Sequence, residues 1–384
     1  MDMPPLPIPS ADALAVSNQL TELIAAEIQA QDGIDFSRYM SLALYAPGLG
    51  YYSGGAVKFG CAGDFVTAPE MSPLFGRCLA RQAAQVVTIV GGSILELGAG
   101  SGRLACDVLA ELLRLDCLPE HYYIVEVSAD LRERQRSLIA RTLPGIAERV
   151  IWLEHLPTEF LGCIVANEVL DAVPVELLHW REDGIYRRCV AWENDRFAWF
   201  DRMLAAGPLR DAAEAIAVPA GYISEIGLTA QALIKSLAQC LTAGVILMID
   251  YGFGEREYYH PQRDRGTIMC HYRQHAHSDP FYLPGLQDIT AHVDFTAMAL
   301  AGLSQDLTLA GYTSQAQFLI NCGITDLLAQ TSASDAARYA PQAAAVQKLL
   351  SPAEMGELFK AIAWCKRMDE PLLGFAAGDQ RLRL

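Results

Sequence analysis

The chain has 384 residues, of which 52% are hydrophobic, and its formal net charge is −16 at pH 7. This composition excludes a disordered chain, and the length suits one large domain or two closely joined domains. The acidic charge, without any Lys/Arg cluster, argues against nucleic-acid binding and is compatible with a basic protein segment as partner.

The compartment is indicated by the cysteines and by the apolar runs. Ten cysteines are scattered along the chain without a C-x-x-C pair, which favours reduced thiols in a cytoplasm over a disulfide framework. No apolar run approaches the roughly 18 residues that span a bilayer, and the N-terminus lacks the pattern of a signal peptide. We therefore expect a cytoplasmic protein without a membrane span, and the sequence leaves its oligomeric state open.

The first 90 residues predict a helix followed by an ordered loop. Four prolines in residues 1–9 indicate a loose arm, Ser10 can cap a helix over 11–30, and Gly33 stops the helical pattern. Residues 45–72 are rich in glycine, proline and aromatic side chains, which is typical of an ordered functional loop. We expect residues 1–90 to form a helical and loop segment that covers a ligand site.

A glycine-rich turn follows, with the sequence SILELGAGSGR at 93–103. The apolar residues predict a buried strand, and glycines at positions 98, 100 and 102 let the backbone turn sharply and approach a ligand, with a helix over 103–115. Arg103 stands where a dinucleotide fingerprint has its third glycine, and Glu96 precedes the turn, so the pattern favours S-adenosyl-L-methionine over NAD. A turn that binds nothing and a nicotinamide-dependent oxidoreductase remain alternatives.

A second acid strengthens the prediction of a cofactor site. The next strand, over 121–127, contains Glu126 near its end, 28 positions beyond Gly98. In a doubly wound sheet this carboxylate lies at the edge beside the glycine turn, where it can accept both hydroxyls of a ribose. A solvated acid at a strand end is the alternative interpretation.

The rest of the chain predicts an α/β fold: a doubly wound, Rossmann-like, mostly parallel sheet with an antiparallel edge. We expect this domain to cover 91–384, with a small antiparallel β insertion at about 177–225 and a second insertion at about 255–300. The expected elements are helices over 129–143 and 229–241, parallel strands over 150–153, 162–166 and 245–250, and edge strands over 358–364 and 372–375.

Five passages resemble those of one known family. They are GLGYYS at 48–53, GDFVTAPE at 63–70, ELGAGSG at 96–102, NEVLDAVP at 167–174 and DITAHVDF at 288–295. The family is that of the mitochondrial complex I assembly arginine methyltransferase and its bacterial relatives, often called MidA, and the chain resembles a bacterial member. The resemblance covers about residues 20–375.

The resemblance implies S-adenosyl-L-methionine as cofactor, a protein arginine as methyl acceptor, and a subunit of respiratory complex I as the protein that carries it. The cofactor site then comprises the residues of the turn, its two acids and the end of the fourth parallel strand: Glu96, Gly98, Gly100, Gly102, Glu126 and Asn167. A cofactor-binding assembly chaperone without turnover and a small-molecule methyltransferase are the alternatives.

The loop after the fourth parallel strand holds the candidate catalytic acids. A guanidinium acceptor is planar and charged, and carboxylates hold it best. Glu168 and Asp171 come from this loop at the edge where ligands of such sheets bind. Either acid could instead cap a following helix.

A histidine-rich segment at 266–280 contains His271, His275 and His277. Prolines and β-rich composition predict a loop here, and since the sequence specifies no ligand geometry, we expect no metal site. The family resemblance places Asp288, His292 and Asp294 in the substrate pocket without a specified role.

Overall fold

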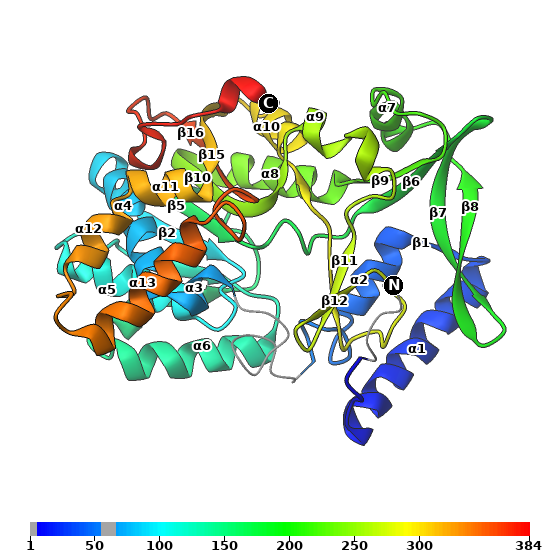
Figure 1. Cartoon of the computed structure of the whole chain (residues 1–384), viewed down its shortest axis with the longest axis horizontal. Helices are drawn as coiled ribbons and strands as arrows, with labels where there is room; N and C mark the ends of the chain where they lie inside the picture. The colour runs from blue at the N-terminus through cyan, green and yellow to red at the C-terminus, as the bar shows by residue number, and fades with distance from the viewer. Residues whose placement is uncertain (1–5, 55–66) are drawn as a thin grey trace. The chain divides into compact units, whose positions relative to one another are not determined.

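The structure is a computed structural model that describes residues 6–54 and 67–384 (Figure 1). Contacts divide the chain into two compact units, which are named here by their contents. The sheet unit comprises Val66–Val169, Ala232–Gly254 and Phe295–Leu384, and the hairpin unit comprises Met1–Phe65, Leu170–Gln231 and Glu255–Asp294. The division expected from sequence, at residue 90 with insertions at about 177–225 and 255–300, stays a prediction.

The sheet unit contains the predicted mostly parallel sheet. Its described strands are β2 (Ser93–Leu97), β3 (Tyr122–Val125), β4 (Val150–Leu153), β5 (Phe160–Asn167), β10 (Leu241–Phe253), β15 (Thr308–Ser314) and β16 (Phe359–Lys366). They lie in the order β15-β16-β10-β5-β2-β3-β4. The pairs from β4 to β10 are parallel, and β16 is antiparallel to both its neighbours. The predicted Rossmann-like sheet with an antiparallel edge is confirmed.

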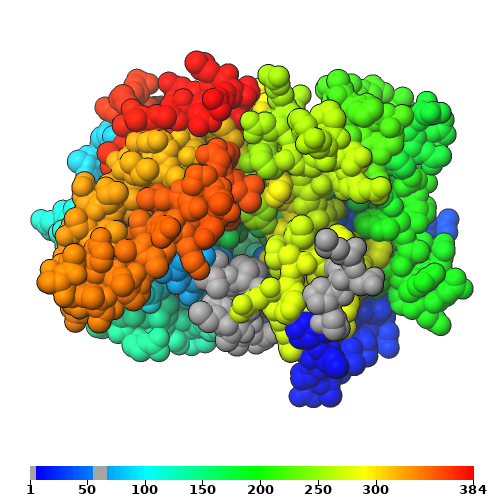
Figure 2. Space-filling model, in the orientation of Figure 1, coloured from blue at the N-terminus to red at the C-terminus, as the bar shows by residue number. Residues whose placement is uncertain are grey.

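Helices pack on both faces of this sheet because its buried strands are apolar on both sides. On β10, Val245, Leu247 and Ile249 share one core with α4 and α5, whereas the buried Ile246 and Met248 point to the opposite face. The helices of this unit include α3 (Ala68–Met71), α4 (Pro73–Val90), α5 (Arg103–Arg114), α6 (Ala129–Thr142), α10 (Phe295–Leu303), α11 (Gln315–Asn321), α12 (Ile324–Ala329) and α13 (Ala336–Leu350). Figure 2 shows α13, in orange, at the surface of the sheet unit.

The prediction of an edge strand over 372–375 is wrong. Leu372 precedes a short 3-10 helix, Leu373–Phe375, and the outermost strand is β15 instead. A four-residue apolar run does not distinguish a strand from a helical turn. Here the Phe375 ring packs on β15, since a Cβ built on Gly311 would lie 2.2 Å from Phe375 Cγ. The run therefore covers the sheet edge rather than extending it.

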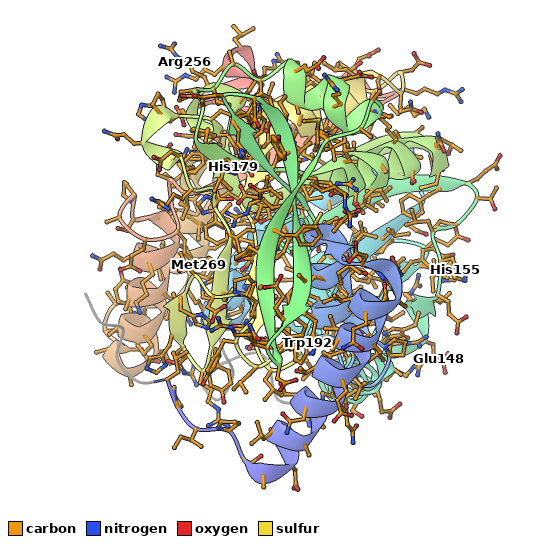
Figure 3. All side chains as sticks on the ribbon, turned by 90° about the vertical axis from the view of Figure 1, so that its right-hand side faces the viewer. Glu148, His155, His179, Trp192, Arg256 and Met269 are labelled. Carbon is orange, nitrogen blue, oxygen red and sulfur yellow. The ribbon has the colours of Figure 1, made fainter. Side chains whose placement is uncertain are left out.

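The hairpin unit contains two smaller antiparallel sheets. One comprises β1 (Ile34–Asp35), β6 (Glu176–Arg181), β7 (Gly184–Glu193), β8 (Arg196–Met203) and β9 (Tyr222–Ile226). Its helices include α1 (Ala11–Gln31), α2 (Phe36–Tyr45), α7 (Pro208–Glu214) and α9 (Glu255–Tyr258), while α8 (Leu228–Cys240) continues into the sheet unit. Figure 3 shows β7 and β8 twisting around each other beside α1, with Trp192 near their turn.

The histidine-rich segment folds into the second small sheet, so the predicted loop is wrong. The strands β11 (Met269–Tyr272) and β12 (His275–His277) form a hairpin, and β13 (Asp288–Thr290) pairs with β11. Arg273 and Gln274 turn this hairpin with φ values of 46° and 63°. Such turns usually use Asn and Gly, which is why the sequence did not reveal it.

The described residues contain neither a membrane-spanning helix nor a metal-binding cluster. No helix outside the uncertain stretches is both long enough and apolar enough to cross a bilayer. In residues 6–54 and 67–384, no group of three or more His, Cys, Asp or Glu side chains is arranged to hold a metal ion.

The packing between β5 and β2 gives a stability test. Gly162 has φ 127°, and a Cβ added there would lie 2.0 Å from Ser93 O. We predict that Gly162→Ala lowers the free energy of unfolding by about 2–5 kcal/mol, through backbone strain and overpacking, in a urea titration. Gly145→Ala is the control, since no heavy atom lies within 4 Å of its added Cβ. Equal stability of the two variants would contradict this close packing.

Candidate functional site

The glycine turn joins β2 to α5 in the sheet unit. Gly98, Gly100 and Gly102 have φ values of 60°, 52° and 84°, in the left-handed region that glycine adopts readily. The Gly98 amide donates to Val125 O at 2.9 Å, which ties the turn to the end of β3. Helix α5 begins at Arg103, directly after Gly102, so its first amides lie next to the turn. Backbone N–H groups are therefore concentrated at this edge.

Glu126 directly follows β3, at the same edge of the sheet. Its side chain is buried, and one oxygen accepts from the Ser128 amide at 3.0 Å while the other accepts from Gln135 Nε2 at 3.1 Å. The next residue, Val127, is 70% exposed and presents an apolar surface. A carboxylate beside an exposed apolar side chain fits a ribose carrying a purine ring.

Glu96 lies one residue before the end of β2 and is 1% exposed. Its Oε2 accepts from the Tyr122 hydroxyl at 2.7 Å. Burial raises the pKa of the Glu96 carboxyl to about 7, against the lowering effect of the Tyr122 hydrogen bond. Glu96 thus supports the turn from within the sheet, and its contact with the cofactor stays a prediction.

The loop after β5 begins with Asn167 and Glu168. Glu168 has φ 51°, and its amide donates to Ile249 O at 2.9 Å on the neighbouring strand β10. The next amide, of Val169, donates to Asp250 Oδ2 at 3.1 Å. These two bonds to β10 hold a backbone conformation that costs about 1–3 kcal/mol for a residue with a side chain. Strain of this kind is typical of functional positions.

The carboxylate of Glu168 is held in place by its neighbours. Its Oε1 accepts from Asn167 Nδ2 at 3.0 Å and, more weakly, from the Ala68 amide at 3.4 Å. The alternative interpretation, that Glu168 or Asp171 caps a following helix, is wrong, because the next element is the strand β6. The loop therefore presents acids without starting a helix.

The other predicted residues belong to the hairpin unit. Asp171 is 7% exposed, and its carbonyl accepts from the Ala291 amide at 2.9 Å. Asp288 is 2% exposed, and Tyr52 donates to its Oδ1 and Oδ2 at 3.1 and 3.0 Å. Burial, and then the charges of both acids among its neighbours, hold the pKa of Tyr52 well above its ordinary value. The hairpin unit thus brings Asp171 and Asp288 close to the same tyrosine.

His292 and Asp294 follow along the same segment. The His292 amide donates to Thr267 Oγ1 at 3.0 Å. Burial, with the charge of Arg263 as the second cause, lowers the pKa of the His292 ring to about 4, so this ring is neutral at pH 7. Burial holds the pKa of Tyr258 and of Tyr259 well above the ordinary value, and the charge of Asp294 adds to this shift in both. Roles for Asp288, His292 and Asp294 in a substrate pocket stay predictions.

Several residues that support the glycine turn and the β5 loop in the sheet unit, or the acids of the hairpin unit, were not singled out from the sequence. Tyr52 stacks on Tyr45 with ring centroids 5.5 Å apart, and Asp250 anchors the strained loop. Tyr52 was visible only as part of the GLGYYS passage, and Asp250 only as an acid ending an apolar run. Gln135 had no sequence signal, since it lies within a charged helix.

The sheet unit therefore has the order of strands, the glycine turn and the acid after β3 that are expected of an S-adenosyl-L-methionine-dependent methyltransferase. The family described as "Putative S-adenosyl-L-methionine-dependent methyltransferase" matches residues 78–313, and the chain belongs to this family. Its cofactor is S-adenosyl-L-methionine, and the residues that would hold it are the glycine turn, Glu126 and Val127.

Relatives of known structure agree with this assignment. A crystal structure from Burkholderia thailandensis, described as a "likely methyl transferase" bound to S-adenosyl-homocysteine, is 48% identical with a TM-score of 0.96. That similarity covers 99% of this chain and 100% of the other. A native crystal structure from the same organism is also 48% identical, with a TM-score of 0.94 and the same coverage.

Curated relatives extend over most of the chain as well. "Protein arginine methyltransferase NDUFAF7, mitochondrial" of Danio rerio is 27% identical over 91% of this chain and 88% of its own length. The homologue of Drosophila melanogaster, named in the same way, is 27% identical over 97% of this chain and 92% of its own length.

The predicted role of Glu126 is tested by calorimetry. A Glu126→Gln variant lacks the negative charge that holds two ribose hydroxyls, so we predict that its Kd for S-adenosyl-homocysteine rises about 10- to 100-fold. Glu133→Gln is the matched control, because the Glu133 side chain on α6 is 73% exposed. An unchanged Kd in the Glu126 variant would show that this carboxylate does not bind the ribose.

The raised pKa of Glu96 predicts a pH-dependent stability. The pKa of Glu96 in the folded protein, about 7, lies above the ordinary 4.5. The protonated carboxyl therefore contributes to the free energy of unfolding in full below pH 4.5, and this contribution is lost as the pH rises through 7. Glu96→Gln is neutral at every pH, so we predict that its stability relative to wild type increases from pH 5 to pH 8 by up to about 3 kcal/mol. Urea titrations at both pH values measure this, with Glu133→Gln again as control. A pH-independent difference would contradict the raised pKa.

Proposed function

We propose that this methyltransferase transfers the methyl group of S-adenosyl-L-methionine to an arginine side chain of a protein. The observation that carries the proposal is that curated relatives, matched along most of both chains, are named protein arginine methyltransferases. Glu168, in the sheet unit, carries a negative charge of the kind that holds a guanidinium. A formal charge of −16 also suits a basic acceptor segment.

The chemistry requires an oriented nitrogen and a place for one proton. The cofactor, when bound, supplies a methyl group on a sulfonium, and the sulfur keeps the bonding electron pair when the nitrogen–carbon bond forms. The guanidinium nitrogen then releases a proton to remain singly charged. Glu168, fixed by its hydrogen bond from Asn167 and by its anchored backbone, is suited to orient the guanidinium and to accept that proton. Asp171 is the second candidate for the same role.

We further propose a subunit of respiratory complex I as the protein acceptor, which the family resemblance implies. Isotope-labelled S-adenosyl-L-methionine is incubated with the protein and a lysate, and labelled bands are digested and analysed for methylated arginine. The proposal predicts label on arginine in a complex I subunit. Label on small molecules alone would support the alternative of a small-molecule methyltransferase, and tight cofactor binding with no label anywhere would support a chaperone without turnover.

Isosteric variants compare the two acids. We predict that Glu168→Gln lowers kcat/KM for the protein acceptor by at least about 100-fold, because the charge that orients the guanidinium is removed while the side-chain shape remains. The Kd for S-adenosyl-homocysteine should stay within about threefold of wild type, as expected when only acceptor contacts change. Asp171→Asn is measured in parallel, and Glu133→Gln is the control. Full activity in both acidic variants would refute a carboxylate-held acceptor.

The compartment is proposed to be the cytoplasm. The cysteines in the described part of the chain are all free, as expected in a reducing compartment. The curated relatives, in contrast, carry the word mitochondrial in their names. Fractionation of cells followed by immunodetection tests the proposal, which recovery of the protein in an organelle would overturn.

A further inference from the structure

The side chain of Gln135 is completely buried within the cofactor site, although it comes from the charged helix α6. Its Nε2 donates to two groups, Gly100 O at 2.9 Å and Glu126 Oε2 at 3.1 Å. Its Oε1 accepts from Trp152 Nε1 at 2.9 Å. One amide thus connects the glycine turn, the Glu126 carboxylate and the strand β4.

The chemistry of its partners fixes the orientation of this amide. An indole N–H can only donate, so the atom that faces Trp152 must be the amide oxygen. The nitrogen then faces Gly100 O and the Glu126 carboxylate, both of which can only accept. A flipped amide would make all three contacts unfavourable, so the assignment of oxygen and nitrogen follows from the partners themselves.

The backbone around Gln135 is also tightly packed. A Cβ built on Gly102 would lie 3.2 Å from both Cα and Cγ of Gln135, so the third glycine of the turn rests directly on this residue. The position of Gln135 therefore influences the turn through packing as well as through hydrogen bonds. A buried amide with satisfied partners is rigid, because breaking any one bond leaves a desolvated polar atom.

We propose that Gln135 is a positioning residue that sets the affinity of the site for the ribose of the cofactor. It acts through Glu126: the bond to Oε2, together with the Ser128 amide on Oε1, fixes the plane of the carboxylate. The bond to Gly100 fixes that plane relative to the turn that receives the rest of the cofactor. This inference rests on the predicted contact between Glu126 and the ribose hydroxyls.

Calorimetry with two ligands tests the proposal. Gln135→Met keeps the approximate size of the side chain and removes all three hydrogen bonds. Its Kd for S-adenosyl-homocysteine should rise about 10- to 100-fold, as is usual when a group that orients a ligand-binding residue is lost. Its Kd for the 2′,3′-dideoxy analogue should change less than about threefold, because this ligand lacks the hydroxyls that Glu126 would bind. At saturating cofactor, kcat should stay near the wild-type value.

The controls separate positioning from folding. Gln347→Met alters an exposed glutamine of α13 and should leave both Kd values unchanged. Trp152→Phe keeps Gln135 but removes the donor that orients its amide. It should give a smaller rise in Kd than Gln135→Met, and this rise should again be larger for S-adenosyl-homocysteine than for the dideoxy analogue. If Gln135→Met does not fold, the Trp152 variant supplies the comparison.

Three results with Gln135→Met would overturn the proposal: an equal loss of affinity for both ligands, no loss of affinity for either, or a fall in kcat with unchanged Kd. The premise is tested separately by wild type and Glu126→Gln. If wild type binds the two ligands equally and Glu126→Gln changes neither Kd, the contact between Glu126 and the ribose is absent.

Discussion

The turn between β2 and α5 is the constraint on which the cofactor site depends. Three glycines with positive φ carry the chain from a buried strand into a helix within five residues, from Gly98 to Gly102. Side chains at these positions would add strain, and at Gly98 and Gly102 they would also crowd Val169 and Gln135. Because the neighbouring strands are parallel, the ends of β3 and β5 lie along the same edge. Glu126 and Asn167 are brought to the turn by sheet topology alone.

A second constraint operates at the end of β5. The left-handed backbone of Glu168 is held by two hydrogen bonds to the neighbouring strand, one to Ile249 and one from Val169 to Asp250. The strain is therefore balanced by β10, whose core residues are fully buried. A rigid sheet that supports a strained, acid-bearing loop suits transfer chemistry, in which orientation of the acceptor supplies much of the acceleration.

Much of this arrangement could be predicted from the sequence, since it depends on local patterns. The apolar runs of β2, β4 and β5, the glycine spacing and the Ser10 cap specify their elements through nearby residues. Edge strands were harder, because a run as short as the one at 372–375 does not distinguish a strand from a helical turn that packs on β15. The turn at Arg273 and Gln274 escaped prediction because neither residue type usually favours positive φ.

Long-range hydrogen bonds could not be predicted in the same way. Gln135 lies in a helix of alternating charges, and nothing in that pattern shows that its amide reaches Gly100 and Trp152. Tyr52 and Asp288 are 236 residues apart in sequence, so their contact depends on the fold of the hairpin unit. The residues that support both sites thus emerge only when distant segments are brought together.

The most direct test of this account is a crystal structure of the protein with S-adenosyl-homocysteine bound. The account predicts the ribose hydroxyls on the Glu126 carboxylate, the purine against Val127, and the amino-acid end beside the glycine turn. A ligand whose ribose lies away from Glu126, with the turn from Gly98 to Gly102 left without contact, would contradict it.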